Sequence, residues 1–381
     1  MNKPAFEGVG IDKCAGCFAC YNSCNLNAIH MTLNDEGFFM PKIDYNSCNN
    51  CGLCSNKCPV IKESKKQNIL MKAFAAWNVD DNIRLNSSSG GIFSAIAKYV
   101  IESLNGVVYG ATFEHGIVKH VRIDSVNDLN ILRKSKYLQS YIGLAYKEVI
   151  QDLKNNKYVL FVGTPCQIEA LNKLVVNNEK LITCDLVCHG VPSYLAFDSY
   201  IQSIGMNIKN IDVDFRNKDN GWKNFKVILK DNVNNKVINT HHIDNKFFKG
   251  FVDNRYLKKS CYNCKFSKMP RVGDITLGDF WGVNEKYYND LGVSIVLTNN
   301  EKGLEVINTL VSREEIVAQN INEDEFGDNK RIYNGVYDIP EGRDEMAEII
   351  NNKGFNIFYK RYIHVTFYKR VINKLKRIFQ V

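Results

Sequence analysis

Eight of the 13 cysteines fall into two short runs near the start of the chain, and their spacing constrains the fold more than any other feature. Each run has two residues between its successive first three cysteines and three residues before its fourth. The runs are Cys14, Cys17, Cys20 and Cys24, then Cys48, Cys51, Cys54 and Cys58, with Pro59 after the last. Two runs with this spacing typically hold two [4Fe-4S] clusters.

In such a pair of runs, the fourth cysteine of each run crosses over to the cluster of the other run. We therefore expect one cluster on Cys14, Cys17, Cys20 and Cys58, and a second on Cys24, Cys48, Cys51 and Cys54. Zinc has no need of such a run, and disulfides require an oxidising compartment that nothing here indicates. Asn25 replaces the usual proline after Cys24, but that proline shapes a turn and is not a ligand. The sequence thus predicts a two-cluster ferredoxin-like module that carries single electrons.

The composition is that of a globular protein. A length of 381 residues is sufficient for two or three domains. No basic segment with a following apolar stretch opens the sequence, and no apolar run reaches about 18 residues. We therefore expect a cytoplasmic protein, in a reducing and anaerobic setting that suits thiolate-bound clusters. The formal net charge is +8. Three clusters with their thiolates, at about −2 each, would reduce it to about +2, so we expect no nucleic-acid partner.

We divide the chain into four parts. Residues 1–66 form the two-cluster domain, 67–150 and 151–340 form the two halves of an α/β body, and 341–381 form a basic helical tail. Within the first part, we expect a β-hairpin at Met31–Ile43. The polar stretch Lys62–Asn68 has the composition of a linker.

Strand and helix patterns alternate along the body, which predicts a parallel sheet. The expected strands are Ala73–Val79, Val107–Phe113, Tyr158–Val162, Leu181–Val187, Ile275–Leu277 and Ser294–Leu297. The expected helices are Ile92–Leu104, Gln167–Val175 and Tyr194–Ile204. An antiparallel β insert is expected from Ile211–Phe215, Phe225–Leu229 and Lys236–Ile243. The fold class is therefore α+β or α/β: an N-terminal dicluster ferredoxin-like module followed by a mixed α/β catalytic body with an antiparallel insert.

Four further cysteines form a candidate third site. Cys166 and Cys188 each follow a predicted strand and precede a helix, and such turns gather at one edge of a parallel sheet. Cys261 and Cys264 are spaced to face one metal centre. On spacing alone, a third [4Fe-4S] cluster, a zinc ion and unligated buried thiols all remain open. We interpret Cys184 as a small buried apolar residue in a strand.

His189, which follows Cys188, is a possible ligand, but we favour a hydrogen-bonding role for it. No acid–base residue stands out, because the histidines at His115, His120, His241 and His242 lie in no recognisable motif. The catalytic residues are therefore unknown at this stage.

Seven stretches resemble the beta subunits of coenzyme F(420)-dependent hydrogenases and dehydrogenases. They are Ser88–Gly91, Ser135–Ser140, Gly163–Gln167, Asp185–Pro192, Phe215–Lys218, Cys261–Cys264 and Gly278–Gly282. Reductases acting on 7-hydroxymethyl chlorophyll a are similar too. The resemblance spans roughly residues 72–300 and implies FAD beside a [4Fe-4S] cluster, with two-electron transfer between the flavin and an organic substrate or a deazaflavin-type coenzyme. It therefore favours a cluster at the third site.

The resemblance also implies candidate cofactor-binding residues. The turn of Ser88, Ser89, Gly90 and Gly91 precedes an expected helix. Its free N–H groups would bind a flavin phosphate, or the turn would simply cap the helix. Lys136 would stabilise an anionic reduced flavin, or be solvated. Trp281 would pack on the cofactor or in the core.

Two cationic regions have less certain roles. Arg216 and Lys218 would grip an acidic substrate, although a charged β surface is the interpretation that we favour. Residues 355–381 contain seven Lys or Arg residues and no acid, with an apolar stripe of Phe367, Val371, Leu375 and Ile378. Such a helix suits peripheral contact with an anionic membrane, docking of an acidic electron carrier, or packing on its own domain.

Two functions remain open on these grounds. The first is a flavin-dependent iron–sulfur oxidoreductase that takes electrons from a ferredoxin or other redox protein. The second is a non-catalytic subunit that relays electrons to a partner enzyme. The fused arrangement resembles proteins encoded near surface-polysaccharide genes, which does not define the substrate. A zinc-stabilised binding module is a third, less favoured reading.

Overall fold

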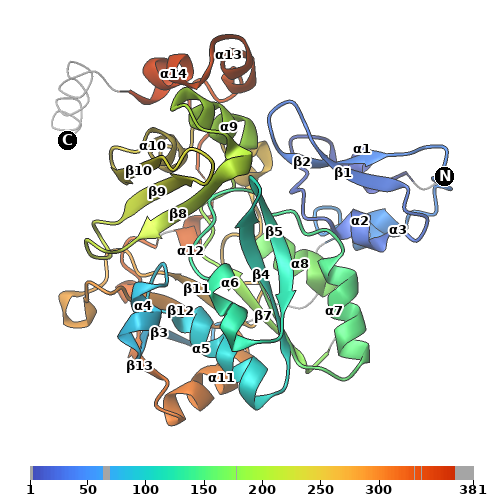
Figure 1. Ribbon diagram of the computed structural model, residues 1–381. Helices are drawn as coiled ribbons and strands as arrows, with labels where there is room; N and C mark the ends of the chain where they lie inside the picture. The colour runs from blue at the N-terminus through green and yellow to red at the C-terminus, as the bar shows by residue number, and fades with distance from the viewer. Residues whose placement is uncertain (1–2, 63–68, 177, 330, 336, 365–381) are drawn as a thin grey trace, which may run out of the picture.

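The computed structural model describes residues 3–62, 69–176, 178–329, 331–335 and 337–364 (Figure 1). Residues 63–68 of the expected linker lie outside these ranges. So do residues 365–381, which contain the whole apolar stripe of the expected basic helix. The described residues form a mixed α/β fold with one large sheet and two small antiparallel sheets.

The large sheet has eight strands within the described residues, in the order β13-β3-β12-β11-β7-β6-β4-β5. Their bounds are β3 (Lys72–Asn78), β4 (Val107–Glu114), β5 (Ile117–Ile123), β6 (Val159–Gly163), β7 (Leu181–Leu186), β11 (Ile275–Asp279), β12 (Ser294–Thr298) and β13 (Ile316–Ile321). The pairings β4–β6, β6–β7 and β7–β11 are parallel. The expected parallel sheet is therefore confirmed at its centre. The antiparallel flanks, with β5 at one edge and β13 at the other, were not predicted.

Helices cover both faces of this sheet (Figure 1). They are α5 (Ile92–Lys98), α6 (Leu129–Leu132) and α11 (Glu301–Ser312) on one face, and α7 (Ala145–Lys154) and α8 (Pro165–Leu174) on the other. Successive side chains of a strand point to opposite faces, so Val159 and Phe161 join the core under α7 and α8, while Leu160 joins the core under α5 and α11. The expected helix Ile92–Leu104 is confirmed, except that its second half, Tyr99–Ser103, is a π-helical turn.

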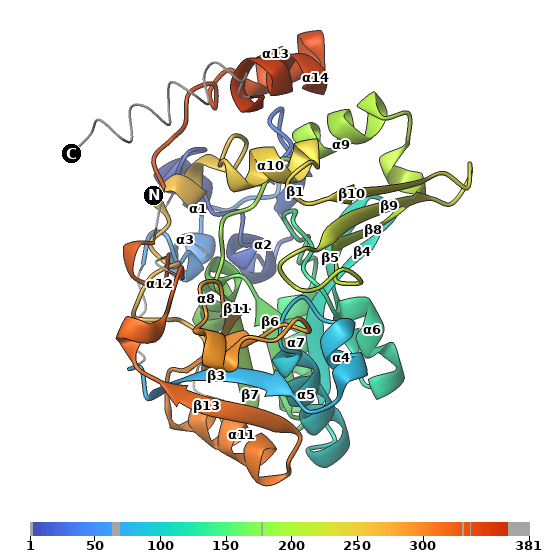
Figure 2. The same ribbon diagram turned by 90° about the vertical axis from the view of Figure 1, so that its left-hand side faces the viewer.

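A three-stranded antiparallel sheet lies beyond one end of the main sheet (Figure 2). It consists of β8 (Ile211–Asn217), β9 (Lys226–Asp231) and β10 (Val237–His241), which confirms the expected insert. Nearby helices are α9 (Tyr194–Ser203), α10 (Lys246–Val252), α13 (Met346–Lys353) and α14 (Phe355–Phe358). The short helices α4 (Asp81–Leu85) and α12 (Arg331–Asn334) complete the body.

The N-terminal module repeats one structural unit. Its elements are α1 (Ala5–Val9), α2 (Ala19–Ser23), β1 (Ile29–Leu33), β2 (Phe39–Ile43) and α3 (Leu53–Lys57), and β1 and β2 form the expected hairpin. Helices α2 and α3 lie 34 residues apart, like the two cysteine runs. Each follows a residue in the left-handed conformation, Phe18 at φ +66° and Gly52 at φ +74°. Each ends just before the fourth cysteine of its run.

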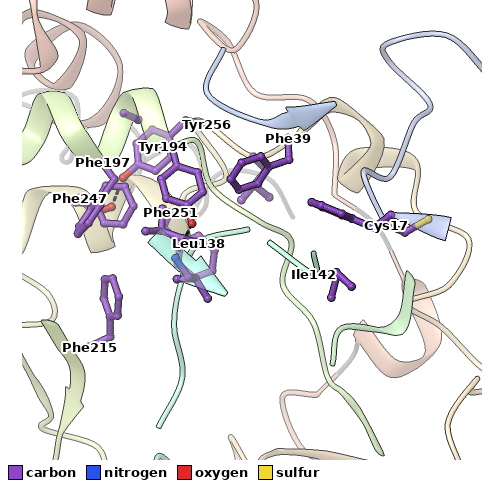
Figure 3. Close-up of a cluster of buried hydrophobic side chains, with 14 of the residues drawn as sticks. Cys17, Phe39, Leu138, Ile142, Tyr194, Phe197, Phe215, Phe247, Phe251 and Tyr256 are labelled. Carbon is purple, nitrogen blue, oxygen red and sulfur yellow. Dashed lines mark hydrogen bonds between the residues drawn. The ribbon is translucent and has the colours of Figure 1, made fainter. Parts of the chain in front are cut away.

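The module shares a hydrophobic core with the body (Figure 3). Phe39 of β2 lies with its ring centroid 5.6 Å from that of Tyr194. The buried Gln139 side chain accepts a hydrogen bond from the Phe39 N–H group at 2.8 Å and donates to the Gly16 carbonyl at 3.2 Å. These contacts place the cysteine-rich module directly against the end of the main sheet.

No helix among the described residues combines the length and the apolar character that crossing a membrane requires.

Candidate functional site

Four cysteines of the N-terminal module form a group in which Cys17 and Cys58 are buried and the other two half-buried, and which we call the proximal set: Cys14, Cys17, Cys20 and Cys58. Burial raises the pKa of the Cys17 thiol, and the charges of Cys20, Cys58 and Cys14 raise it further. Such mutual effects require the four sulfur atoms to lie close together. They are the same four residues that the crossed ligation pattern assigns to one cluster.

The other four cysteines of the module, which we call the distal set, are Cys24, Cys48, Cys51 and Cys54. Cys51 is exposed, and Cys54 accepts a hydrogen bond on its sulfur from the Ala5 N–H group at 3.4 Å. The charge of Cys54 also raises the pKa of Cys58, after the larger effect of burial. The distal set therefore adjoins the proximal set and lies nearer to solvent.

The main sheet brings the remaining candidate ligands together, and we call them the third set: Cys166, Cys188, Cys261 and Cys264. Cys166 follows β6 in the first turn of α8, and Cys188 follows the neighbouring strand β7. Burial raises the pKa of Cys261 to about 12, and the charges of Cys264 and Cys188 contribute to the rise. The expected convergence at the carboxyl edge of the sheet is therefore found.

A [4Fe-4S] cluster places each cysteine on a different iron atom, whereas a zinc ion gathers four ligands about one point. Among the described residues, no three His, Cys, Asp or Glu side chains are arranged to hold a single metal ion.

Two other residues near this set behave as expected. Cys184 is buried in β7 and belongs to the core under α5 and α11. The Nε2 atom of His189 lies 3.2 Å from the Phe251 carbonyl oxygen, which is within hydrogen-bonding distance.

The proximal and third sets are neighbours. The charge of Cys17 raises the pKa of Cys166, after the larger effects of burial and of Cys264. The Tyr146 hydroxyl group lies 3.0 Å from the carbonyl oxygens of both Cys17 and Gln167, the residue after Cys166. One buried side chain thus joins the backbone that carries the proximal set to the backbone that carries the third.

A large cavity opens beside the third set, with a volume of about 1350 Å³. All four cysteines of the third set line it, together with Ser88, Ser89, Gly91, Lys136 and Trp281. Its lining contains seven Lys or Arg residues and three Asp residues, and no Glu. Ligand pockets commonly hold about 300–1000 Å³, so this one has room for a large anionic cofactor and a second molecule.

Buried cations organise the Ser88–Gly91 turn. Arg216 donates from Nη2 to the Ser88 carbonyl at 3.0 Å, and Lys218 donates from Nζ to the Ser89 carbonyl at 2.9 Å. The Ser88 hydroxyl faces that of Ser135 at 3.0 Å. Gly90 does not line the cavity, and a Cβ there would lie 2.4 Å from the Ala76 carbonyl oxygen.

The favoured interpretation of Arg216 and Lys218 as a charged β surface was wrong. Their exposed fractions are 1% and 2%, because both side chains turn inward at the end of β8. Arg216 forms two hydrogen bonds to Asp279 at 2.8 and 3.0 Å, and Lys218 reaches three backbone carbonyl oxygens. A charge pattern in an isolated strand does not reveal such partners.

Lys136 and Trp281 both reach the cavity. Two backbone carbonyl oxygens, of Ile131 and Arg133, accept hydrogen bonds from the Lys136 amine at 3.1 and 2.6 Å. Burial lowers the pKa of this amine to about 7, although Asp214 opposes the shift. Trp281 stacks on Trp222, with 5.1 Å between ring centroids, so it serves the core and the cavity wall together.

His120 is a cavity residue that sequence reasoning missed. Its Nε2 lies 2.9 Å from the Val162 carbonyl oxygen, so this nitrogen donates and Nδ1 accepts from the Ser140 hydroxyl group at 2.6 Å. Burial lowers the pKa of the ring to about 4. The neutral ring therefore holds the Ser140 hydroxyl in place. The sequence signal for the burial of His120 was its position two residues after Val118 in a strand, since alternate residues of a strand point to the same face.

Comparison with known proteins places these features in context. Residues 156–324 match the C-terminal part of the family described as the coenzyme F420 hydrogenase/dehydrogenase beta subunit, and residues 13–61 match the 4Fe-4S dicluster domain. The ferredoxin-type protein NapF of Haemophilus influenzae is 39% identical over 44 residues, or 12% of this chain. The match spans 25% of the length of that relative.

A solved structure of the F420-reducing [NiFe] hydrogenase complex from Methanosarcina barkeri, derivatised with xenon, contains a similar chain. The TM-score is 0.49 at 18% sequence identity, and the alignment covers 79% of this chain and 94% of that chain.

The cysteine runs and the matching dicluster domain define an iron–sulfur protein of the electron-transferring oxidoreductases. Behind the 4Fe-4S dicluster domain, residues 156–324 carry the C-terminal region of the coenzyme F420 hydrogenase/dehydrogenase beta-subunit family.

Proposed function

We propose that this chain is a flavin-dependent oxidoreductase with three [4Fe-4S] clusters, one on each cysteine set. The observation that carries the proposal is the shared cavity, in which four convergent cysteines face the same space as the Ser88–Gly91 turn and Lys136. A cluster and a redox cofactor in one cavity can exchange electrons. The size and the cationic lining of the cavity fit FAD, whose diphosphate is anionic.

The arrangement of the cysteine sets supports one order of transfer. Electrons from a ferredoxin or another redox protein would enter at the distal set, where Cys51 is exposed. They would continue to the proximal set and from there to the third set, because Cys17 and Cys166 are neighbours. The direction can reverse, since the potentials of such clusters span about a volt.

A flavin, when bound, supplies the conversion between single electrons and the electron pairs that most organic reductions need. The chain's own residues bind and orient it. Arg216 and Lys218 hold the turn that would meet its phosphates, and Lys136 offers a cation at the cavity wall. The substrate would be an organic molecule or a deazaflavin-type coenzyme, and residues 67–340 would form the catalytic body behind the two-cluster domain 1–66.

The test is anaerobic purification with iron, acid-labile sulfide, zinc and flavin measured together. We expect about 12 iron atoms and one flavin per chain, because each cluster contains four irons. About eight irons with one zinc would remove the third cluster. Full clusters without flavin would make the chain an electron relay, and a colourless protein without labile sulfide would end the proposal altogether.

A matched pair of variants separates ligation from simple burial. Cys166→Ala should lower the iron content by about four atoms per chain, since a cubane with three thiolates is readily lost. Cys184→Ala removes another buried thiol of the same sheet, outside the third set, and should leave the iron content unchanged. Equal iron contents in the two variants would contradict a cluster on the third set.

A further inference from the structure

Lys258 is a buried cation at the boundary between the N-terminal module and the body. Its exposed fraction is 3%, and it directly precedes the 3-10 helix Lys259–Asn263, which contains Cys261. Its amine donates to the Met40 sulfur of β2 at 2.6 Å and lies 5.1 Å from the centroid of the Phe38 ring. It does not line the large cavity.

Two buried arginines of the described residues have carboxylate partners, whereas the buried Lys218 amine is bound by three backbone carbonyl oxygens. Arg271 pairs with Asp185 at 2.6 Å, and Arg343 pairs with Glu36 at 2.7 Å. Lys258 forms no ion pair with any Asp or Glu of the described residues within 4.0 Å. Burying an ammonium group without a counter-charge is strongly unfavourable, so the charge of Lys258 needs a compensating group.

The nearest compensating charges belong to two cysteine sets. Burial lowers the pKa of Lys258, while Cys14 of the proximal set and Cys261 and Cys166 of the third set raise it, together with Glu36. The geometry agrees, because a Cβ built on Gly16, between Cys14 and Cys17, would lie 3.5 Å from the Lys258 Cε, and the Cys261 N–H group donates to the Lys258 carbonyl at 2.8 Å. The amine therefore lies within electrostatic reach of both sets.

We infer that Lys258 is the shared counter-cation of the proximal and third clusters and poises electron transfer between them. This rests on the proposed function in that both sets must hold clusters. Each oxidised cluster with four thiolates carries about −2, and one added electron makes it about −3. A fixed positive charge beside both sites stabilises the added electron on either, which raises both potentials. The electron leaves one cluster and reduces the other, with no bond made or broken.

The test is an anaerobic redox titration of the full-length holoprotein, followed by the electron paramagnetic resonance signals of the clusters. In Lys258→Met, the reduced-to-oxidised ratio of two of the three clusters should fall at least tenfold at a given solution potential, a shift of about 59 mV. The affected clusters should be those of the proximal and third sets. The signal of the distal cluster should stay unchanged. Lys258→Arg should keep the wild-type potentials.

Lys302→Met is the matched control, since Lys302 is a partly buried lysine at the opposite edge of the sheet, hydrogen-bonded to the Leu181 carbonyl. If Lys258→Met loads its clusters and shifts no potential beyond this control, the inference is wrong. The iron content of the wild-type protein tests the proposed function separately, so the two failures are distinguishable.

If Lys258→Met fails to assemble its clusters, Lys258→Gln and Lys258→Arg decide the matter. If the clusters assemble in Lys258→Arg but not in Lys258→Gln, the positive charge is required, which supports the inference. Equal loss in both would assign Lys258 a role in shape alone and would overturn it.

Discussion

At the scale of single residues, the cationic side chains around the cavity differ in what neutralises their charge. Arg216 is bound twice by Asp279, so its charge is satisfied inside the protein. Lys136 donates to the neutral carbonyl oxygens of Ile131 and Arg133, and burial lowers the pKa of its amine to about 7 although the charge of Asp214 opposes the shift. The charge on Lys136 is therefore sensitive to a bound anion.

This difference predicts a pH-dependent affinity. Below pH 7 the Lys136 amine is protonated before the ligand arrives, and above pH 7 it must take up a proton as an anion binds. We expect the Kd for FAD to rise by up to about tenfold between pH 6 and pH 8, measured by fluorescence titration. Lys136→Met should bind FAD weakly and with a flat profile. A wild-type Kd that is constant across this range would contradict the prediction.

At the scale of elements, the β1–β2 hairpin docks on the start of α9 through its turn. The Tyr194 N–H group donates to the Gly37 carbonyl at 3.0 Å, and the Ser193 hydroxyl donates to the Glu36 carbonyl at 2.6 Å. Gly37 has φ +77°, and a Cβ there would lie 2.2 Å from the Leu195 backbone nitrogen. The turn can approach the helix only because this residue has no side chain.

Gly37→Ala should therefore loosen the module from the body. Gly10→Ala is the control, because Gly10 has φ +73° and a Cβ added there would meet nothing within 4 Å, so it carries only the backbone strain. We expect Gly10→Ala to cost about 1 kcal/mol and Gly37→Ala about 2 kcal/mol more, from the added clash. The measurement is the thermal midpoint of the holoproteins at one scan rate. Equal midpoints would show that the turn tolerates a side chain.

At the scale of the whole molecule, the proposed function needs two lengths of chain that are distant in sequence to form one path for electrons. The hydrophobic core runs without a break from Phe18 and Phe39 of the module to Tyr146 and Phe161 of the body. This packing keeps the proximal and third cysteine sets adjacent. A loose tether between two domains would not hold such sites at a constant separation.

Breaking this path at either end should have different consequences. Cys51→Ala should remove the distal cluster and lower ferredoxin-driven flavin reduction at least tenfold, while flavin stays bound and dithionite still reduces it. Cys261→Ala should keep both clusters of the module but disconnect them from the flavin. Stopped-flow absorbance gives both rates. Loss of flavin from Cys51→Ala would refute the modular picture, and unchanged flavin reduction in Cys261→Ala would remove the third set from the path.

Much of this arrangement was predictable, because it depends on local spacing or on a general rule of topology. The repeat of α2 and α3 follows from two cysteine runs of equal spacing, and the approach of Cys166 to Cys188 follows from parallel strands ending at one edge. Other features depend on partners far along the chain. Arg216, His120 and Lys258 are buried polar residues, and their hydrogen-bond partners include Asp279, Ser140 and Met40, respectively.

The sequence by itself determined the cysteine sets, the alternation of strands and helices, and the family likeness, because each is written in short-range spacing. Only the tertiary structure decided which cations are buried, how the module docks and which cysteine set adjoins the cavity. These depend on contacts between residues far apart in the chain, such as Gln139 with Phe39 at a separation of 100 positions and Tyr146 with Cys17 at 129. Burial and electrostatic compensation are properties of that packing, which no local pattern encodes.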